Sequence, residues 1–312
     1  MGNILIVDEA ALPSARAALE AHGHRCFKAR NEAELETVLR NHPIDILLSP
    51  IRKPEASFEC FDLARRYRPQ CRGIAVISDG LEKYLPQLLL RAFPHNFVAD
   101  NRPIDAHELV ATVEKLLGND IFGIEKYGVT PHENLSLHSS EEKYLLLERV
   151  RNFYLVQGMS EPLTRNVELI LDELLTNAYS VAPNRPGSSP DEASPLLSYG
   201  LSSERLALSV SDPWGEMSPK TFFSYVHRCF SEKSVLEDPG RGAGMGLFLI
   251  FKSLDQLVIN VAVHRKTEVI ALLHPWTSRG ALKKRRHSFH YFQIDEAEAG
   301  KEQFQDDSKI KN

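Results

Sequence analysis

The sequence Pro-Gly-Arg-Gly-Ala-Gly-Met-Gly occupies residues 239–246, and the apolar stretch Leu-Phe-Leu-Ile-Phe-Lys-Ser-Leu follows it at residues 247–254. Glycine at every second position from 240 to 246 lets the backbone approach a polyphosphate, because no side chain stands in the way. The apolar stretch predicts a helix, whose first N–H groups and positive dipole end favour an anion. No Gly-Lys-Ser/Thr follows, so this is not a P-loop and, taken alone, is weak evidence for a nucleotide.

A carboxylate and a carboxamide share one face of an earlier helix, predicted at residues 162–181. In Leu-Asp-Glu-Leu-Leu-Thr-Asn-Ala, residues 171–178, Glu173 and Asn177 are four positions apart. Their face borders the apolar stripe of the helix, where oxygen atoms suit Mg²⁺ beside a phosphate. Such a pair is common on helices, so by itself it favours two ordinary exposed polar residues.

A strand is predicted at residues 205–211, and it ends in Asp212-Pro-Trp-Gly215. In this order, the three motifs resemble the GHKL ATP-binding fold of histidine kinases, gyrase, Hsp90 and the anti-sigma-factor serine kinases. The resemblance implies an α/β sandwich that binds ATP and Mg²⁺, with Glu173 as the catalytic carboxylate, Asn177 as the metal ligand and Asp212 as the acceptor for the adenine amino group. It implies further nucleotide contacts at Gly215, Gly240, Gly242, Gly244 and Gly246. Trp214 stands at the usual first glycine of D-x-G-x-G, and Gly215 comes one residue late.

The first 117 residues alternate short apolar runs with amphipathic stretches. Strands are predicted at residues 3–7, 44–48, 73–77 and 97–99, and helices at 14–21, 58–67, 81–91 and 105–117. This alternation predicts an open parallel sheet covered on both faces. Ligands of such sheets bind at the carboxyl ends of the strands.

The residues at those strand ends resemble the five-stranded, flavodoxin-like receiver domain of bacterial response regulators. Asp8 and Glu9 stand where a receiver keeps its magnesium-binding acids, Lys53-Pro54 follows the third strand, and Ser78 matches the switch hydroxyl. The phosphoacceptor position holds Pro50, beside Ser49, and Arg102 replaces the usual lysine. Proline has no nucleophile, so we expect a pseudo-receiver that is not phosphorylated on aspartate. Alternatively, Asp8 and Glu9 simply close a strand.

The predicted domains are a receiver-like domain at residues 1–118, a linker at 119–138, the ATP-binding domain at 139–277, and an edge strand with a disordered tail at 278–312. Glycine and proline without apolar periodicity indicate the linker. Alternating aromatic residues at 288–294 favour the edge strand. Residues 296–312 are charged and nearly free of apolar side chains, which is typical of disorder.

The amino-acid composition and net charge of the chain limit the kinds of partner that it is expected to bind. With 43% hydrophobic and 25% charged residues the chain has the composition of a globular protein, and its net charge of -5 gives no general case for nucleic acid or an anionic membrane. The apolar runs are strand-length, and the four cysteines form no C-x-x-C pair. We therefore expect a cytoplasmic protein without a membrane span.

The branches of the resembled family differ in the segments that accompany the ATP-binding domain. A histidine kinase needs a helix hairpin that carries a phosphoacceptor histidine, and no such hairpin is found here. The helix predicted after Ser139 contains no histidine, and 312 residues are too few for the transducer domains of gyrase or Hsp90. The compact arrangement resembles the anti-sigma-factor type, which implies a serine/threonine protein kinase whose partner is an antagonist or a sigma-factor-like regulator. The alternative is a nucleotide-gated partner-binding module without phosphotransfer. The receiver-like domain is also a candidate surface for a homodimer.

Overall fold

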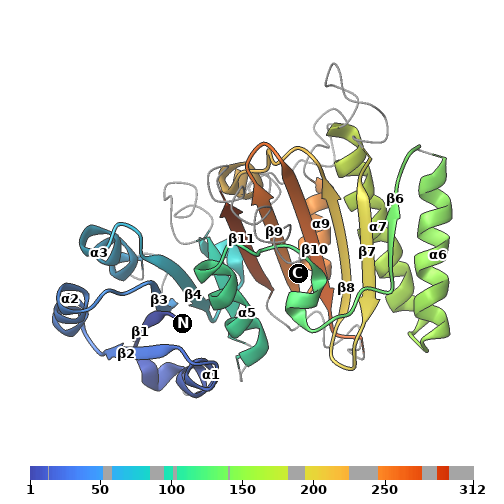
Figure 1. Ribbon diagram of the computed structural model, residues 1–312. Coiled ribbons are helices and arrows are strands. Elements are labelled where there is room, and N and C mark those ends of the chain that lie inside the picture. The colour runs from blue at the N-terminus through green and yellow to red at the C-terminus, as the bar shows by residue number, and fades with distance from the viewer. Residues whose placement is uncertain are drawn as a thin grey trace, which may run out of the picture. The chain divides into compact units, whose positions relative to one another are not determined.

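The computed structural model describes residues 1–12, 14–51, 58–84, 95–100, 104–139, 141–181, 194–224, 245–275 and 287–294 (Figure 1). The chain divides into two compact units. The first comprises Met1–Gly118, Pro219–Gly244 and Lys284–His290, and the second Asn119–Ser218, Met245–Lys283 and Tyr291–Asn312. Within the described ranges, every helix is too short or too polar to cross a lipid bilayer.

The first unit contains a parallel five-stranded sheet in the order β2-β1-β3-β4-β5. Its strands are β1 (Asn3–Val7), β2 (Arg25–Ala29), β3 (Ile46–Ile51), β4 (Arg72–Ile77) and β5 (Asn96–Ala99). Its helices are η1 (Glu9–Ala11), α1 (Ala15–Ala21), α2 (Glu32–Asn41), α3 (Glu59–Tyr67), η2 (Leu81–Tyr84) and α5 (Ala106–Leu117). This strand order is the flavodoxin-like order found in receiver domains, so the fold predicted for this region is confirmed.

Strand β2 and helix α2 have no counterpart among the elements predicted from the sequence. β2 is the outermost strand of the order, and only Ala29 of its five residues is buried. It carries Arg25 and Lys28 instead of an apolar run, as expected for an exposed edge. The helix predicted at residues 81–91 begins as η2, and the rest of it lies outside the described residues.

The segment Ser288–Ile294 is a strand, β11, but not an exposed edge strand. Six of its seven residues are buried. In the first unit, Phe289 and His290 pair antiparallel with β5. The ring of Phe222 stacks on Phe289 with centroids 4.3 Å apart. The alternating aromatic residues therefore mark a strand covered on both faces.

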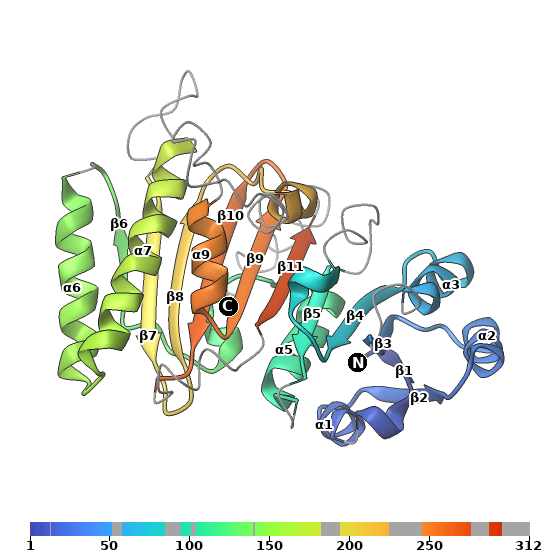
Figure 2. The same ribbon diagram turned by 180° about the vertical axis from the view of Figure 1, so that it is seen from behind.

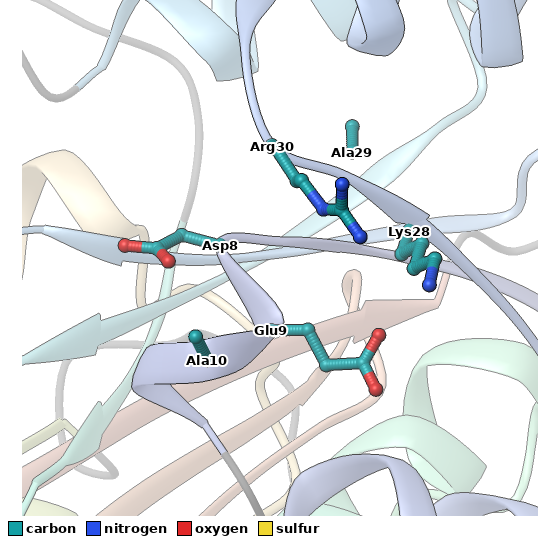
Figure 3. Close-up of a pocket in the computed structure, with 6 residues that line it drawn as sticks. All are labelled: Asp8, Glu9, Ala10, Lys28, Ala29 and Arg30. Carbon is teal, nitrogen blue, oxygen red and sulfur yellow. The ribbon is translucent and has the colours of Figure 1, made fainter.

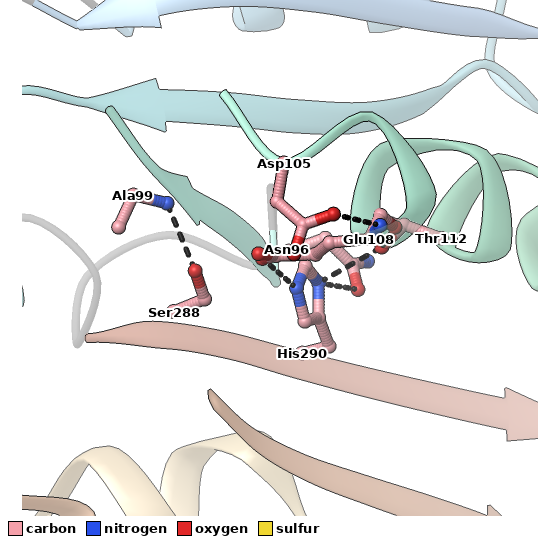
Figure 4. Close-up of polar contacts among 7 residues, drawn as sticks. All are labelled: Asn96, Ala99, Asp105, Glu108, Thr112, Ser288 and His290. Atoms are coloured by element: carbon pink, nitrogen blue, oxygen red, sulfur yellow. Dashed lines mark hydrogen bonds and ion pairs between the residues drawn. The ribbon is translucent and has the colours of Figure 1, made fainter. Parts of the chain in front are cut away.

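A cluster of buried polar side chains connects the start of β11 to β5 and α5 through hydrogen bonds (Figure 4). His290 is fully buried, and its Nε2 lies 2.9 Å from Oε1 of Glu108. Its Nδ1 lies 3.3 Å from Oδ1 of Asn96. The hydroxyl of Ser288 accepts the backbone N–H of Ala99 at 3.0 Å. Three chain segments of the first unit thus meet at one histidine.

The second unit contains an antiparallel sheet in the order β9-β10-β8-β7-β6. The strands are β6 (Glu133–Ser136), β7 (Leu196–Leu201), β8 (Leu206–Asp212), β9 (Gln256–Ala262) and β10 (Lys266–Leu273). The helices are η3 (Ile124–Tyr127), α6 (Glu142–Val156), α7 (Glu161–Val181) and α9 (Met245–Ser253). Helices α6, α7 and α9 lie on one face, with α7 in contact with α6, α9 and β8 (Figure 2).

The apolar stripe predicted for α7 is buried, which explains the position of the helix on the sheet. Leu163, Val167, Ile170 and Leu174 are each at most 7% exposed. These residues recur at a spacing of three or four, so they lie along the side that packs on the sheet.

Residues 119–138, predicted as a linker, are instead packed into the second unit. They include η3 and β6, and they bury Ile121, Ile124, Tyr127 and Val129. The backbone N–H of Gly123 donates to the Glu268 carboxylate of β10 at 3.0 Å. Glu268 is only 4% exposed and also accepts from Ser209 and Asn260, each at 2.8 Å. Glycines separate the apolar residues of this segment, so the sequence shows no period although the segment is folded.

Candidate functional site

The start of α9 meets the middle of α7 in the second unit. A Cβ added to Gly246, the second residue of α9, would lie 1.9 Å from both the carboxyl carbon and Oε1 of Glu173. The Glu173 carboxylate therefore fills the space that any side chain at position 246 would need. Two motifs that are far apart in the sequence are in contact, and a carboxylate lies at the positive end of a helix.

Asn177 lies one turn after Glu173 on α7. Its Nδ2 donates to Oε1 of Glu173 at 3.1 Å. Glu173 is half-buried and Asn177 is exposed, so the pair borders solvent. Because the amide nitrogen donates to Glu173, the amide oxygen of Asn177 is directed away from that carboxylate.

Asp212 ends strand β8, as the sequence predicts. It is paired in register with Thr267 of β10, and its Oδ1 accepts the backbone N–H of Trp214 at 2.9 Å. Burial raises the pKa of Asp212, and hydrogen bonds from Trp214, Gly215 and Thr267 oppose that rise. The carboxylate is consequently held in a fixed orientation at the carboxyl end of the strand.

Gly215 has a structural role that explains its position. Its φ is +66°, and an added Cβ would lie 2.0 Å from the carbonyl oxygen of Ala262. The backbone nitrogens of His264 and Arg265 would be 2.8 Å away. Only glycine fits this close approach to the β9–β10 turn. Trp214 is 7% exposed, so a packed side chain occupies the position of the first glycine in the D-x-G-x-G motif.

Several predicted site residues lie outside the described residues. They are Gly240, Gly242 and Gly244 of the glycine-rich loop, together with Lys53, Pro54 and Arg102 of the receiver-like domain. The structure thus brings together Glu173, Asn177 and Gly246, and it places Asp212 with Gly215 at the end of β8.

At the carboxyl edge of the first unit, the carboxylate of Glu9 is already paired with an arginine. Arg16 of α1 binds Glu9 through both oxygens, with Nε–Oε1 at 2.7 Å and Nη2–Oε2 at 3.0 Å. The Arg16 guanidinium thereby lowers the pKa of Glu9. Asp8 and Glu9 point in different directions along the rim of a cavity of about 550 Å³ (Figure 3). In the described part of the chain no three acidic, histidine or cysteine side chains are grouped as a metal site.

The position of a receiver's phosphoacceptor is part of a strand here. Pro50 belongs to β3 and is paired with Val76 of β4. Ser49 is 3% exposed, and its hydroxyl accepts from the Cys60 thiol at 3.4 Å. The Ser78 hydroxyl donates to Asp100 at 3.4 Å. The acceptor position therefore offers no carboxylate, and the neighbouring hydroxyl is buried.

Replacing Gly246 with alanine should destabilise the second unit by about 1–3 kcal/mol, because the new methyl group overlaps the Glu173 carboxyl group. Urea unfolding of the full chain measures this loss. The same substitution made together with Glu173→Ala should cost much less, since the space is then open. Equal losses with and without Glu173 would show that the two side chains do not compete for this space.

Comparisons with known proteins give partial likenesses only. No known protein family matches the sequence, and no curated protein matches it. A response regulator from Thermotoga maritima is 20% identical and covers 38% of this chain and 98% of its own, with a TM-score of 0.32. A CheY-like receiver domain protein from Methanospirillum hungatei JF-1 is 26% identical over 37% of this chain and 94% of its own, with a TM-score of 0.31. A chain of the SiaB-SiaC complex from Pseudomonas aeruginosa is 13% identical over 46% of this chain and 89% of its own, with a TM-score of 0.37. The fold assigned to the first unit rests on its strand order.

Proposed function

We propose that this chain is an ATP-binding bacterial signalling protein whose second unit is a GHKL-type serine/threonine kinase acting on a protein partner. The receiver-like first unit is its regulatory domain and is not phosphorylated on aspartate. The observation that carries the proposal is the contact between Glu173 and Gly246, with Asn177 hydrogen-bonded to Glu173. A carboxylate, a carboxamide and a helix N-terminus meet there.

The residues fit ATP and Mg²⁺ in three respects. The start of α9, beside Glu173, offers backbone N–H groups and the positive end of a helix dipole, which suit a phosphate. The amide oxygen of Asn177 is a suitable ligand for Mg²⁺. The Asp212 carboxylate, oriented by Trp214, is a suitable acceptor for an adenine amino group. ATP would supply the phosphoryl group, and Glu173 would orient or deprotonate the attacking hydroxyl of the partner.

A second function follows from the same contact. Glu173 packs on Gly246 and accepts from Asn177, so its carboxylate also joins α7 to α9. If that is its whole role, the protein is a nucleotide-gated module that binds a partner without phosphotransfer. Both functions need the same ATP site, and they differ in what the Glu173 carboxylate does.

ATP binding tests the proposal directly. Asp212→Asn should weaken Mg²⁺-dependent ATP binding by about 1.5–3 kcal/mol, because the amide cannot replace a charged acceptor. That loss corresponds to about 10- to 150-fold in Kd, measured by titration calorimetry of the full chain. Asp79→Asn, in the first unit, is the control and should bind like the wild type, and chelation of Mg²⁺ should abolish binding. Equal affinity for the wild type and Asp212→Asn would remove the adenine assignment.

A further inference from the structure

The cavity at the carboxyl ends of β1 and β2, in the first unit, is large enough for an organic ligand. It has a volume of about 550 Å³ and is lined by residues 8–10, which follow β1, and residues 28–30, where β2 ends (Figure 3). Small-molecule sites commonly have volumes of about 300–1,000 Å³. A water molecule needs only about 30 Å³, so a single inorganic ion would leave most of this cavity empty.

Two cations, Lys28 and Arg30, lie on the β2 side of this cavity. Both are exposed, and neither side chain forms a hydrogen bond or an ion pair with a residue that the structure describes. Both extend toward the side on which the Glu9 carboxylate lies (Figure 3). A lysine on an edge strand is ordinary protection of that edge. Arg30 lies beyond the last residue pair of β1 and β2, so edge protection does not account for it.

The nearby Glu9 carboxylate does not pair with these two cations. Both of its oxygens accept hydrogen bonds from Arg16, at 2.7 and 3.0 Å. The hydrogen bond from Arg16 lowers the pKa of Glu9, and the charges of Lys28 and Arg30 contribute to the same shift. The two cations are therefore close enough to act on Glu9 electrostatically, while their N–H groups remain available to a ligand.

Backbone hydrogen bonds hold both walls of the cavity in place. Asp8 has a φ of +50° and a ψ of +55°, and its N–H donates to the carbonyl oxygen of Ala29 at 2.9 Å. On the other wall, the N–H of Arg30 donates to Oε2 of Glu34 at 2.9 Å, and the Asn31 side chain caps α2. A left-handed conformation is uncommon for a residue other than glycine, and such residues are concentrated at ligand sites.

We propose that this cavity binds a small phosphate ester that carries hydroxyl groups, such as a sugar phosphate. Lys28 and Arg30 donate to the phosphate oxygens. Asp8 and Glu9 accept from the hydroxyl groups, since each carboxylate oxygen can accept two hydrogen bonds. Exposed ion pairs are individually weak, so a doubly charged phosphate that engages both cations is favoured over a single carboxylate. Such a ligand gives the first unit an input that needs no phosphoacceptor aspartate.

Titration calorimetry of the full chain with ribose 5-phosphate measures this binding. Metal-free buffer separates the cavity from the proposed ATP site, whose ligand requires Mg²⁺. We expect a Kd of about 0.1–1 mM, and binding of inorganic phosphate that is about tenfold weaker, because it has no organic part to fill the cavity. A wild type that binds no ribose 5-phosphate at about 10 mM, ten times the weakest expected Kd, overturns the proposal. Citrate binding as tight as that of ribose 5-phosphate overturns the choice of phosphate.

Variants of the exposed cations show whether the ligand lies in this cavity. Lys28→Gln and Arg30→Gln should each raise the Kd by about 3- to 10-fold, whereas Lys28→Arg keeps the charge and should retain binding. The matched control is Arg25→Gln, which removes the same charge from the opposite end of β2 and should bind like the wild type. Wild-type affinity in both Lys28→Gln and Arg30→Gln would place the ligand elsewhere and overturn the proposal. An equal loss in Arg25→Gln would show general attraction of anions and overturn it as well.

Discussion

Replacing Glu173 with glutamine should slow phosphoryl transfer to the protein partner by about 10²- to 10⁴-fold, with Mg²⁺-ATP affinity nearly unchanged. Glutamine keeps the length and volume of glutamate, so the packing against Gly246 is retained. Its amide cannot take a proton from a hydroxyl group. The substitution therefore separates the chemistry of the carboxylate from its role as a spacer between α7 and α9.

Transfer of labelled phosphate from ATP to protein in a cognate lysate measures the rate, and the product should be acid-stable, as phosphoserine is. Asp172→Asn is the matched control on the same helix. The Asp172 carboxylate pairs with Lys143 at 2.7 Å and takes no part in the contact with Gly246. We expect this variant to keep its activity. A wild type that labels no protein, yet releases a partner when ATP is added, would establish the nucleotide-gated module instead.

The central elements of both units could be predicted from the sequence because their burial leaves a periodic pattern. β1 and β4 are apolar runs, since helices cover a parallel sheet on both faces. The α7 stripe recurs at helical spacing, which a helix packed on one side of a sheet produces. Where a strand is mostly exposed, or where a segment buries only isolated side chains, the apolar residues show no periodic pattern. β2 is exposed, and the 119–138 segment packs through isolated residues between glycines.

Part of the candidate site depends on tertiary contacts that no local pattern encodes. The sequence places Glu173 and Asn177 on one helix face, because a spacing of four residues determines that. It does not show that Glu173 fills the space beside Gly246, since this depends on how α7 and α9 pack. The same holds for Gly215, whose glycine is required by the β9–β10 turn. Arg16 donates to both oxygens of Glu9, a contact that the sequence does not indicate.

Removal of the Glu108 carboxylate should destabilise the first unit by about 3–5 kcal/mol, because the buried imidazole of His290 then loses the partner of its Nε2 atom. His290 is fully buried, and Glu108 is 6% exposed. The variant Glu108→Leu keeps most of the volume, so the loss reports mainly on the polar contact at 2.9 Å. For a unit of this size the loss corresponds to a fall in Tm of about 10 °C or more.

Calorimetric unfolding of the full chain measures this effect, and two further variants identify its origin. Asp79→Ala breaks an exposed ion pair with Lys83 in the same unit and should cost less than about 1 kcal/mol. The double variant Glu108→Leu with His290→Phe should be more stable than Glu108→Leu alone. It also removes the His290 imidazole, which the single variant leaves buried without the Glu108 carboxylate. Thr112 remains satisfied in that background, since its hydroxyl donates to the backbone carbonyl of Glu108 at 2.8 Å. Additive losses in the double variant would mean that the two side chains stabilise the fold separately, and that β11 is held to α5 by its apolar residues.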